Sequence, residues 1–190
     1  MLNKLIHDFA LWLDGMTWST ALHESFYMYN WVESTHVVAL MLSLGMLFLI
    51  DLRILGYALP NVPATDVAKK LQTPMFIGFA VMIITGVLLF YAIPVRTSQS
   101  LWFRFKLVLL FAAAINALLF HRHLRDTPAL AIPEANSPGR LKIGAALSIA
   151  FWAFIVICGR LIAYDWYDCS YSQSEGIRIL AGCVDGQTQF

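Results

Sequence analysis

Four long apolar segments constrain what this chain can fold into more than any other feature of it. Helices rise about 1.5 Å per residue and a membrane's hydrocarbon core is about 30 Å thick, so about 20 residues are enough to cross it. Strands of a membrane barrel would alternate over about 10 residues, and these segments do not alternate. We therefore expect an all-α integral membrane protein, with an antiparallel four-helix transmembrane bundle over residues 29–165. The predicted spans are residues 31–50, 74–95, 101–120 and 143–164.

The overall composition agrees with a membrane protein. Of the 190 residues, 59% are hydrophobic and 13% are charged, whereas charged residues make up about 25% of a typical soluble domain. This balance excludes a soluble enzyme. A net charge of +1 without a basic stripe excludes a nucleic-acid-binding protein.

Residues 1–28 differ from the four spans because charged residues interrupt their apolar positions. Leu2, Leu5, Phe9 and other apolar residues recur at helical spacing, but the run is too short and too charged to span. It also lacks the uninterrupted core of a signal peptide. We expect an amphipathic helix that lies among the lipids at the membrane interface, with Trp12 and Trp18 as anchors.

The loop charges predict the orientation. Four spans place both termini on one side of the membrane. Outside the spans, seven Lys or Arg lie in loops 51–73 and 121–142, against three on the side of the termini. Positively charged loops stay in the cytoplasm, so both termini should be external.

Two cysteines lie in the external tail, residues 166–190. Cys169 and Cys183 are 14 residues apart, a comfortable loop for a disulfide, and an oxidising compartment would permit one. The alternative is a pair of free thiols. Cys158 lies within the fourth span, where packing is the expected role.

Three ionisable side chains from three different spans lie at one depth. His36, Lys106 and Arg160 are each about 7 Å below the external interface, and Arg104 is shallower. Snorkelling of Lys and Arg to the interface is one explanation. The other is a cationic site that binds a haem propionate, a carboxylate or a quinone oxygen.

His36 is either a polar packing residue or a metal ligand or proton-transfer group. If it is a ligand, Ser34, Thr35 or Ser43 could orient its imidazole through the other ring nitrogen. His23, just outside the first span, could bind the haem iron as a second ligand.

Other side chains are weaker candidates for ligands of a haem iron. Met28 is a further possible axial group, and His7 is expected to be a surface histidine. His121 and His123 lie about 22 Å from His36 along the helix axis, so they cannot share a haem iron with it. A cytoplasmic cluster is the ordinary explanation for them.

Several polar and small residues in the spans are expected to have structural roles. Asp51 and Arg53 predict an interfacial ion pair or a helix end. Asn116 predicts a hydrogen bond to a neighbouring helix. Small residues that would let helices approach closely are Gly45, Gly78, Gly86 and Gly144.

Residues 30–165 also carry an ordered set of short motifs, which resembles the uncharacterised four-span bacterial membrane proteins of the DUF6644 and DUF2214 type. The set is similar, more distantly, to the membrane domain of the copper-resistance protein CopD and to the protoporphyrinogen oxidase HemJ. These share a His early in the first span, a Thr-Gly in the second and a Lys early in the third. The motifs include Trp31-Val32-x-Ser34-x-His36, Thr85-Gly86-x-Leu88, Phe105-Lys106 and Gly159-Arg160.

The resemblance implies a multi-pass protein of the bacterial inner membrane. In HemJ the corresponding His and Lys are functional and the protein binds haem b, so the resemblance implies haem b near His36 and Lys106.

Three functions compete at this point. The first is a membrane haem b protein that passes electrons, with a quinone or an external redox partner, or oxidises a small substrate. In it His36 is the axial ligand, and Lys106 and Arg160 hold propionates or substrate oxygens. The second is a non-catalytic accessory or assembly subunit of a larger membrane complex. The third is copper or small-solute transport.

Overall fold

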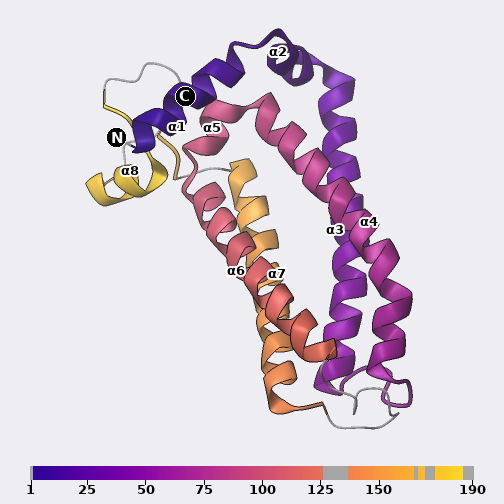
Figure 1. Cartoon of the computed structure of the whole chain (residues 1–190). Coiled ribbons are helices and arrows are strands. Elements are labelled where there is room, and N and C mark those ends of the chain that lie inside the picture. Colours follow the sequence, from indigo (N-terminus) through magenta and orange to yellow (C-terminus); the bar gives the residue numbers. More distant parts are fainter. Residues whose placement is uncertain (1, 126–136, 165–166, 170–173, 186–190) are drawn as a thin grey trace. The chain divides into compact units, whose positions relative to one another are not determined.

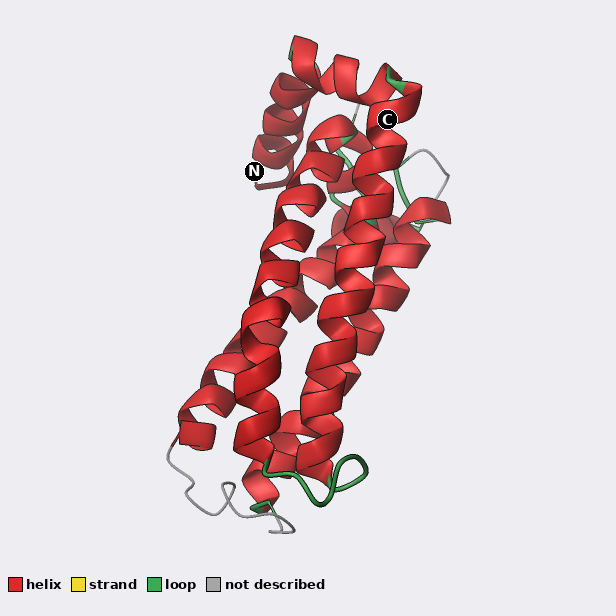
Figure 2. Cartoon of the chain, turned by 90° about the vertical axis from the view of Figure 1, so that its right-hand side faces the viewer, coloured by secondary structure: helices red, strands yellow, loops and turns green. Residues whose placement is uncertain are grey.

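The computed structural model describes residues 2–125, 137–164, 167–169 and 174–185, and these contain helices and no strand (Figures 1 and 2). The helices follow one another in the order α1 Leu2–Asp14, α2 Thr17–Glu24, α3 Phe26–Leu55, α4 Ala64–Ala92, α5 Pro94–Ser98, α6 Leu101–Arg125, α7 Gly139–Tyr164 and α8 Glu175–Ala181.

Four of these helices, α3, α4, α6 and α7, are long and apolar enough to cross a membrane. This confirms the four segments expected from the sequence and is typical of a multi-pass membrane protein. The helices extend beyond the predicted spans. In particular, α4 begins at Ala64, and Pro74, the predicted start of the second span, lies inside the helix. Membrane helices tolerate an internal proline because neighbouring groups can satisfy the carbonyl that it leaves without a donor.

The connection between the second and third long helices is itself helical. The second predicted span reached residue 95, but α4 ends at Ala92 and Pro94 starts the short helix α5. Proline suits the first position of a helix because its φ is already helical and its missing N–H would have had no partner there.

The amphipathic N-terminal segment forms two helices rather than one, α1 and α2, which break at Gly15 and Met16. One side of α1 packs against α5, and the opposite side exposes an apolar stripe. The stripe consists of Leu2, Leu5, Phe9 and Trp12. The exposed stripe makes α1 amphipathic, while a location in the membrane interface stays a prediction.

The chain divides into two compact units, and the long helices contribute to both. Unit 1 comprises residues 1–36, 83–108 and 156–190, and unit 2 comprises residues 37–82 and 109–155.

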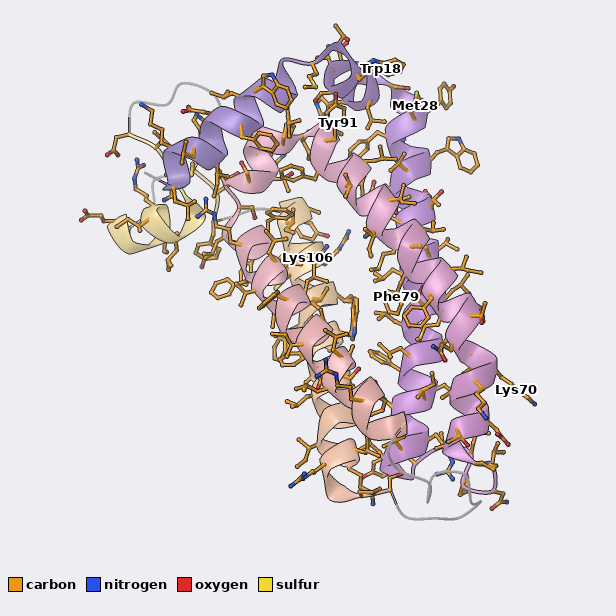
Figure 3. The ribbon with its side chains drawn as sticks, in the orientation of Figure 1. Trp18, Met28, Lys70, Phe79, Tyr91 and Lys106 are labelled. Atoms are coloured by element: carbon orange, nitrogen blue, oxygen red, sulfur yellow. A yellow bond between two sulfur atoms is a disulfide. The ribbon has the colours of Figure 1, made fainter. Side chains whose placement is uncertain are left out.

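Unit 2 has an apolar core between segments of α3, α4 and α7. Phe79, labelled in Figure 3, packs against this core. Its ring centroid lies 5.1 Å from that of Trp152. Residues of the core include Ile50, Ile54, Val67, Met75, Leu141 and Ala145.

Close helix approach in unit 2 occurs at two of the predicted glycines. A Cβ on Gly78 would collide with Ser43 Oγ, and a Cβ on Gly144 would lie 3.1 Å from Phe120. Gly45 does not belong to this group, because a Cβ there would meet nothing within 4 Å. The predicted interhelix bond of Asn116 is present, since its Nδ2 donates to Gly144 O at 3.0 Å.

Arg53 closes the turn between α3 and α4. Its Nε donates to Val62 O at 2.6 Å and its Nη2 to Pro60 O at 3.3 Å. Asp51 instead hydrogen-bonds to Ser148 on α7. Of the two alternatives for these residues, the structure therefore shows a helix end.

In unit 1, buried polar groups tie the N-terminal helices to the α5 region. His7 is buried, and its Nδ1 lies 3.2 Å from Gln99 Nε2. The expectation of a surface histidine was wrong because α1 turns this side chain toward α5 rather than toward its exposed stripe. Ser19 Oγ on α2 donates to Tyr91 O at 2.8 Å.

The C-terminal segment is also joined to the α5 region and to α1. Cys169 and Cys183 form the predicted disulfide. Cys169 Sγ also lies 3.9 Å from Gln99 O, and Asn3 Nδ2 donates to Ile179 O at 3.2 Å. Both ends of the chain are thereby held to one unit.

Candidate functional site

His36 lies on α3 in unit 1 and contacts α4. Its Nδ1 and Thr85 Oγ1 are 3.0 Å apart and form a hydrogen bond between the two helices. The imidazole is partly buried, whereas Thr85 is only 7% exposed. The bond fixes the orientation of the ring because it engages one nitrogen with a buried partner.

The next residue of α4 makes room for this ring. A Cβ on Gly86 would lie 3.2 Å from His36 Cε1 and 3.7 Å from Nδ1. At 3.2 Å a carbon atom is closer than van der Waals contact allows, so any larger residue would push the imidazole away. Thr85 and Gly86 together hold His36 from one side.

The hydrogen-bond partner of His36 differs from the three that the sequence suggested. Ser43 donates to Ala39 O at 2.7 Å, and both Ser34 and Thr35 are exposed. Thr85 orients the ring instead. The signal was present in the sequence, because Thr85-Gly86 is one of the shared motifs, but nothing in the sequence paired it with His36.

Lys106, labelled in Figure 3, lies on α6 and is partly buried in unit 1. A Cβ on Gly159 would lie 3.4 Å from its Nζ, so the ammonium group rests against the backbone of α7. The Cys158 thiol, buried as expected, is close enough for an electrostatic interaction with it. No carboxylate of the described residues forms an ion pair with this lysine.

Arg160 is on the exposed side of α7. Its Nη2 donates to the hydroxyl of Tyr164 at 2.5 Å, and its guanidinium carbon lies 4.8 Å from the centroid of that ring. This pairing joins the cation to a tyrosine of its own helix and does not distinguish snorkelling from a ligand site. A role for Arg160 in ligand binding stays a prediction.

The shallow cation Arg104 has a structural role in unit 1. Its Nη1 donates to Asn3 Oδ1 at 3.1 Å and its Nε to Ser98 O at 3.2 Å. The guanidinium occupies the space that a side chain at Gly182 would need. Gly182 has a φ of +84°, which also favours glycine.

The remaining candidate ligands lie outside the contacts of His36 described above. His23, on α2, is exposed and packs edge-on against Tyr29, with ring centroids 6.4 Å apart. Met28 is exposed at the start of α3. The backbones of His121 and His123 belong to α6, but their side chains lie outside the described part of the chain.

The candidate ligands differ in what they could hold. Within the described residues, His, Cys, Asp and Glu side chains form no group of three that could hold a metal ion. A porphyrin brings the equatorial ligands of its own iron, so one oriented imidazole is enough to anchor it. These residues offer one imidazole held through a ring nitrogen and, on another helix, one ammonium group; their use for haem stays a prediction.

The comparisons with known proteins give a family but no function. The model of DUF6644, described as a family of unknown function, matches residues 22–165. No curated protein and no solved structure matches the chain.

Proposed function

The chain belongs to the DUF6644 family, whose function is unknown, and for this member we propose haem b binding within the membrane. The proposed activity is electron transfer, or oxidation of a quinone-like or other small substrate. When bound, haem supplies one-electron redox chemistry. The protein's own residues hold it and set its electrostatic surroundings.

The observation that carries this proposal is the hydrogen bond between His36 Nδ1 and Thr85 Oγ1. Histidines that bind metals almost always donate their other N–H to a fixed partner, which sets both tautomer and ring orientation. In the tautomer whose Nδ1–H donates to Thr85 Oγ1, Nε2 is the nitrogen that would face iron. Gly86, which has no side chain, leaves the space that the ring needs in this position.

The cations Lys106 and Arg160 are proposed to bind the negatively charged groups of the ligand. Lys106 and, nearer the end of α7, Arg160 offer positive charge for propionates or substrate oxygens. Their attraction to a bound dianion would offset the cost of placing cations among apolar helices. His23 is the proposed second ligand, from the helix that precedes α3. The resemblance of His36, Lys106 and Thr85-Gly86 to the HemJ pattern also supports this assignment.

A variant series tests this function. In protein purified in detergent, His36→Ala should remove the haem absorption band, because it removes the iron ligand. Lys106→Ala should keep the band but weaken haem retention or shift the midpoint potential. His121→Ala is the matched control and should leave the spectrum unchanged. A spectrum that disappears in His121→Ala and survives in His36→Ala would place the site at the other end of the spans.

The same purification separates this function from the alternative of an accessory subunit. A colourless protein that purifies with a stoichiometric partner protein would favour the accessory subunit and overturn the haem proposal.

We also propose that the four long helices form an antiparallel bundle in the inner membrane, with both termini external. The Cys169–Cys183 disulfide supports this side because disulfides persist in oxidising compartments. The bond from Asn3 to Ile179 supports a common side for the two termini. Alkaline phosphatase fused after Phe190 should be active, whereas the same enzyme fused within residues 126–136 should be inactive. The reverse pattern would refute the orientation.

A further inference from the structure

Unit 2 contains a buried carboxyl group that the haem proposal does not use. Asp51, in the last turns of α3, is 1% exposed and belongs to the most deeply buried side chains described. Its one described hydrogen-bond partner is Ser148 on α7, which is also buried. Asp51 Oδ2 has no hydrogen-bond partner among the described residues.

The surroundings of this carboxyl are apolar. Its neighbours along the buried side of α3 are Ile50 and Ile54, which belong to the unit 2 core. From α7, Leu141 and Ala145 join the same core. These described apolar residues supply no hydrogen-bond donor for Oδ2.

Among the cations of unit 2 that the structure describes, none forms an ion pair with Asp51. The Arg53 guanidinium donates to the carbonyls of Pro60 and Val62. On α4, Lys69 and Lys70 are exposed, and on α7 so is Arg140, while Lys142 is partly buried. Ion pairs within the described residues join Arg96 to Asp168 and Arg178 to Asp185, and Asp51 takes part in neither.

We propose that Asp51 is a proton-binding site, at which the buried carboxyl takes up and releases a proton while Ser148 holds its orientation. An ionised carboxylate without a cation is far more costly in an apolar core than a carboxylic acid is. Oδ2, which has no hydrogen-bond partner in the described part of the chain, is the oxygen that can carry the proton. The step moves one proton between water and Oδ2, moves no electrons and needs no co-reactant.

This site is independent of the haem proposal, because its residues belong to unit 2 whereas His36, Thr85 and Lys106 belong to unit 1. A colourless protein would leave it standing.

The test is labelling of the full-length protein in membranes with dicyclohexylcarbodiimide, followed by peptide mass spectrometry. This apolar reagent adds to a carboxylic acid: the acid's proton goes to a carbodiimide nitrogen and its oxygen bonds to the central carbon. Asp51 should be modified, less so as the pH is raised, with recovery when the pH is lowered again. A charged, water-soluble carbodiimide should leave Asp51 unmodified.

Two variants sharpen the result. Asp66, which is exposed on α4, supplies the matched control: Asp66→Asn should not change the labelling of Asp51. Ser148→Ala removes a hydroxyl that bonds to the carboxyl, so labelling should extend to higher pH.

The proposal is overturned by any of three results. The first is an unlabelled Asp51 in folded protein. The second is labelling that does not change with pH, since the proton would then not exchange. The third is protection by sodium ions rather than by raised pH, which would make this a metal-cation site.

Discussion

Thr85→Val tests whether the bond between α3 and α4 serves a ligand on His36. Valine has nearly the shape of threonine but lacks the hydroxyl, so packing at this buried position is kept while the hydrogen bond is lost. The bond joins Nδ1 and Oγ1 at 3.0 Å, which is ordinary hydrogen-bond geometry. His36 would remain on α3 with a less well-fixed ring.

The expected magnitude follows from two considerations. A hydrogen bond of this kind contributes about 1 kcal/mol net to stability. Loss of a partner that orients a metal-bound histidine typically lowers metal affinity by about 10- to 100-fold, equivalent to about 1.4 to 2.7 kcal/mol. We therefore expect haem affinity in Thr85→Val to fall by roughly 10-fold or more. In His36→Ala the affinity should fall much further.

The assay is titration of haem into apoprotein in detergent, followed by absorbance. Thr85→Ser is the matched control, since it keeps a hydroxyl at the same position and should bind nearly as well as the wild type. Equal haem affinity in Thr85→Val and the wild type would refute the idea that this bond orients an iron ligand. The threonine would then be only a link between helices.

Two further changes test the structure away from His36. Replacement of both Cys169 and Cys183 by Ser should weaken the attachment of the C-terminal segment by up to about 3 kcal/mol, because the bridge closes a loop with a sequence separation of 14. Hydrogen exchange should then rise in α8 and stay unchanged in α4, and a uniform rise would contradict this. Gly78→Ala should destabilise unit 2 because its methyl group would collide with Ser43, whereas Gly45→Ala should not; comparing their thermal inactivation in detergent checks this, and equal behaviour would be contrary to the structure.

Helix existence could be predicted from the sequence because membrane thickness sets a minimum length for an apolar run. Helix ends could not. The first turns of α4, from Ala64, are polar, and hydropathy cannot distinguish a polar helix turn from a loop. The Cys169–Cys183 pair could be predicted because these are the two cysteines in the tail.

The contact of Thr85 with His36 could not be predicted. It depends on how α3 and α4 rotate about their axes, and hydropathy does not fix that rotation, because lipid-facing and helix-facing positions are both apolar. Asp51 and Arg53 illustrate a related limit. Residues two apart on a helix point in different directions, so these two side chains form no ion pair although they are close in sequence.

The most direct test of the central claim is one difference spectrum, dithionite-reduced minus oxidised, of the detergent-purified wild-type protein. The account predicts the absorption bands of haem b in stoichiometric amount. A pure, folded and colourless protein that takes up no added haem would contradict it.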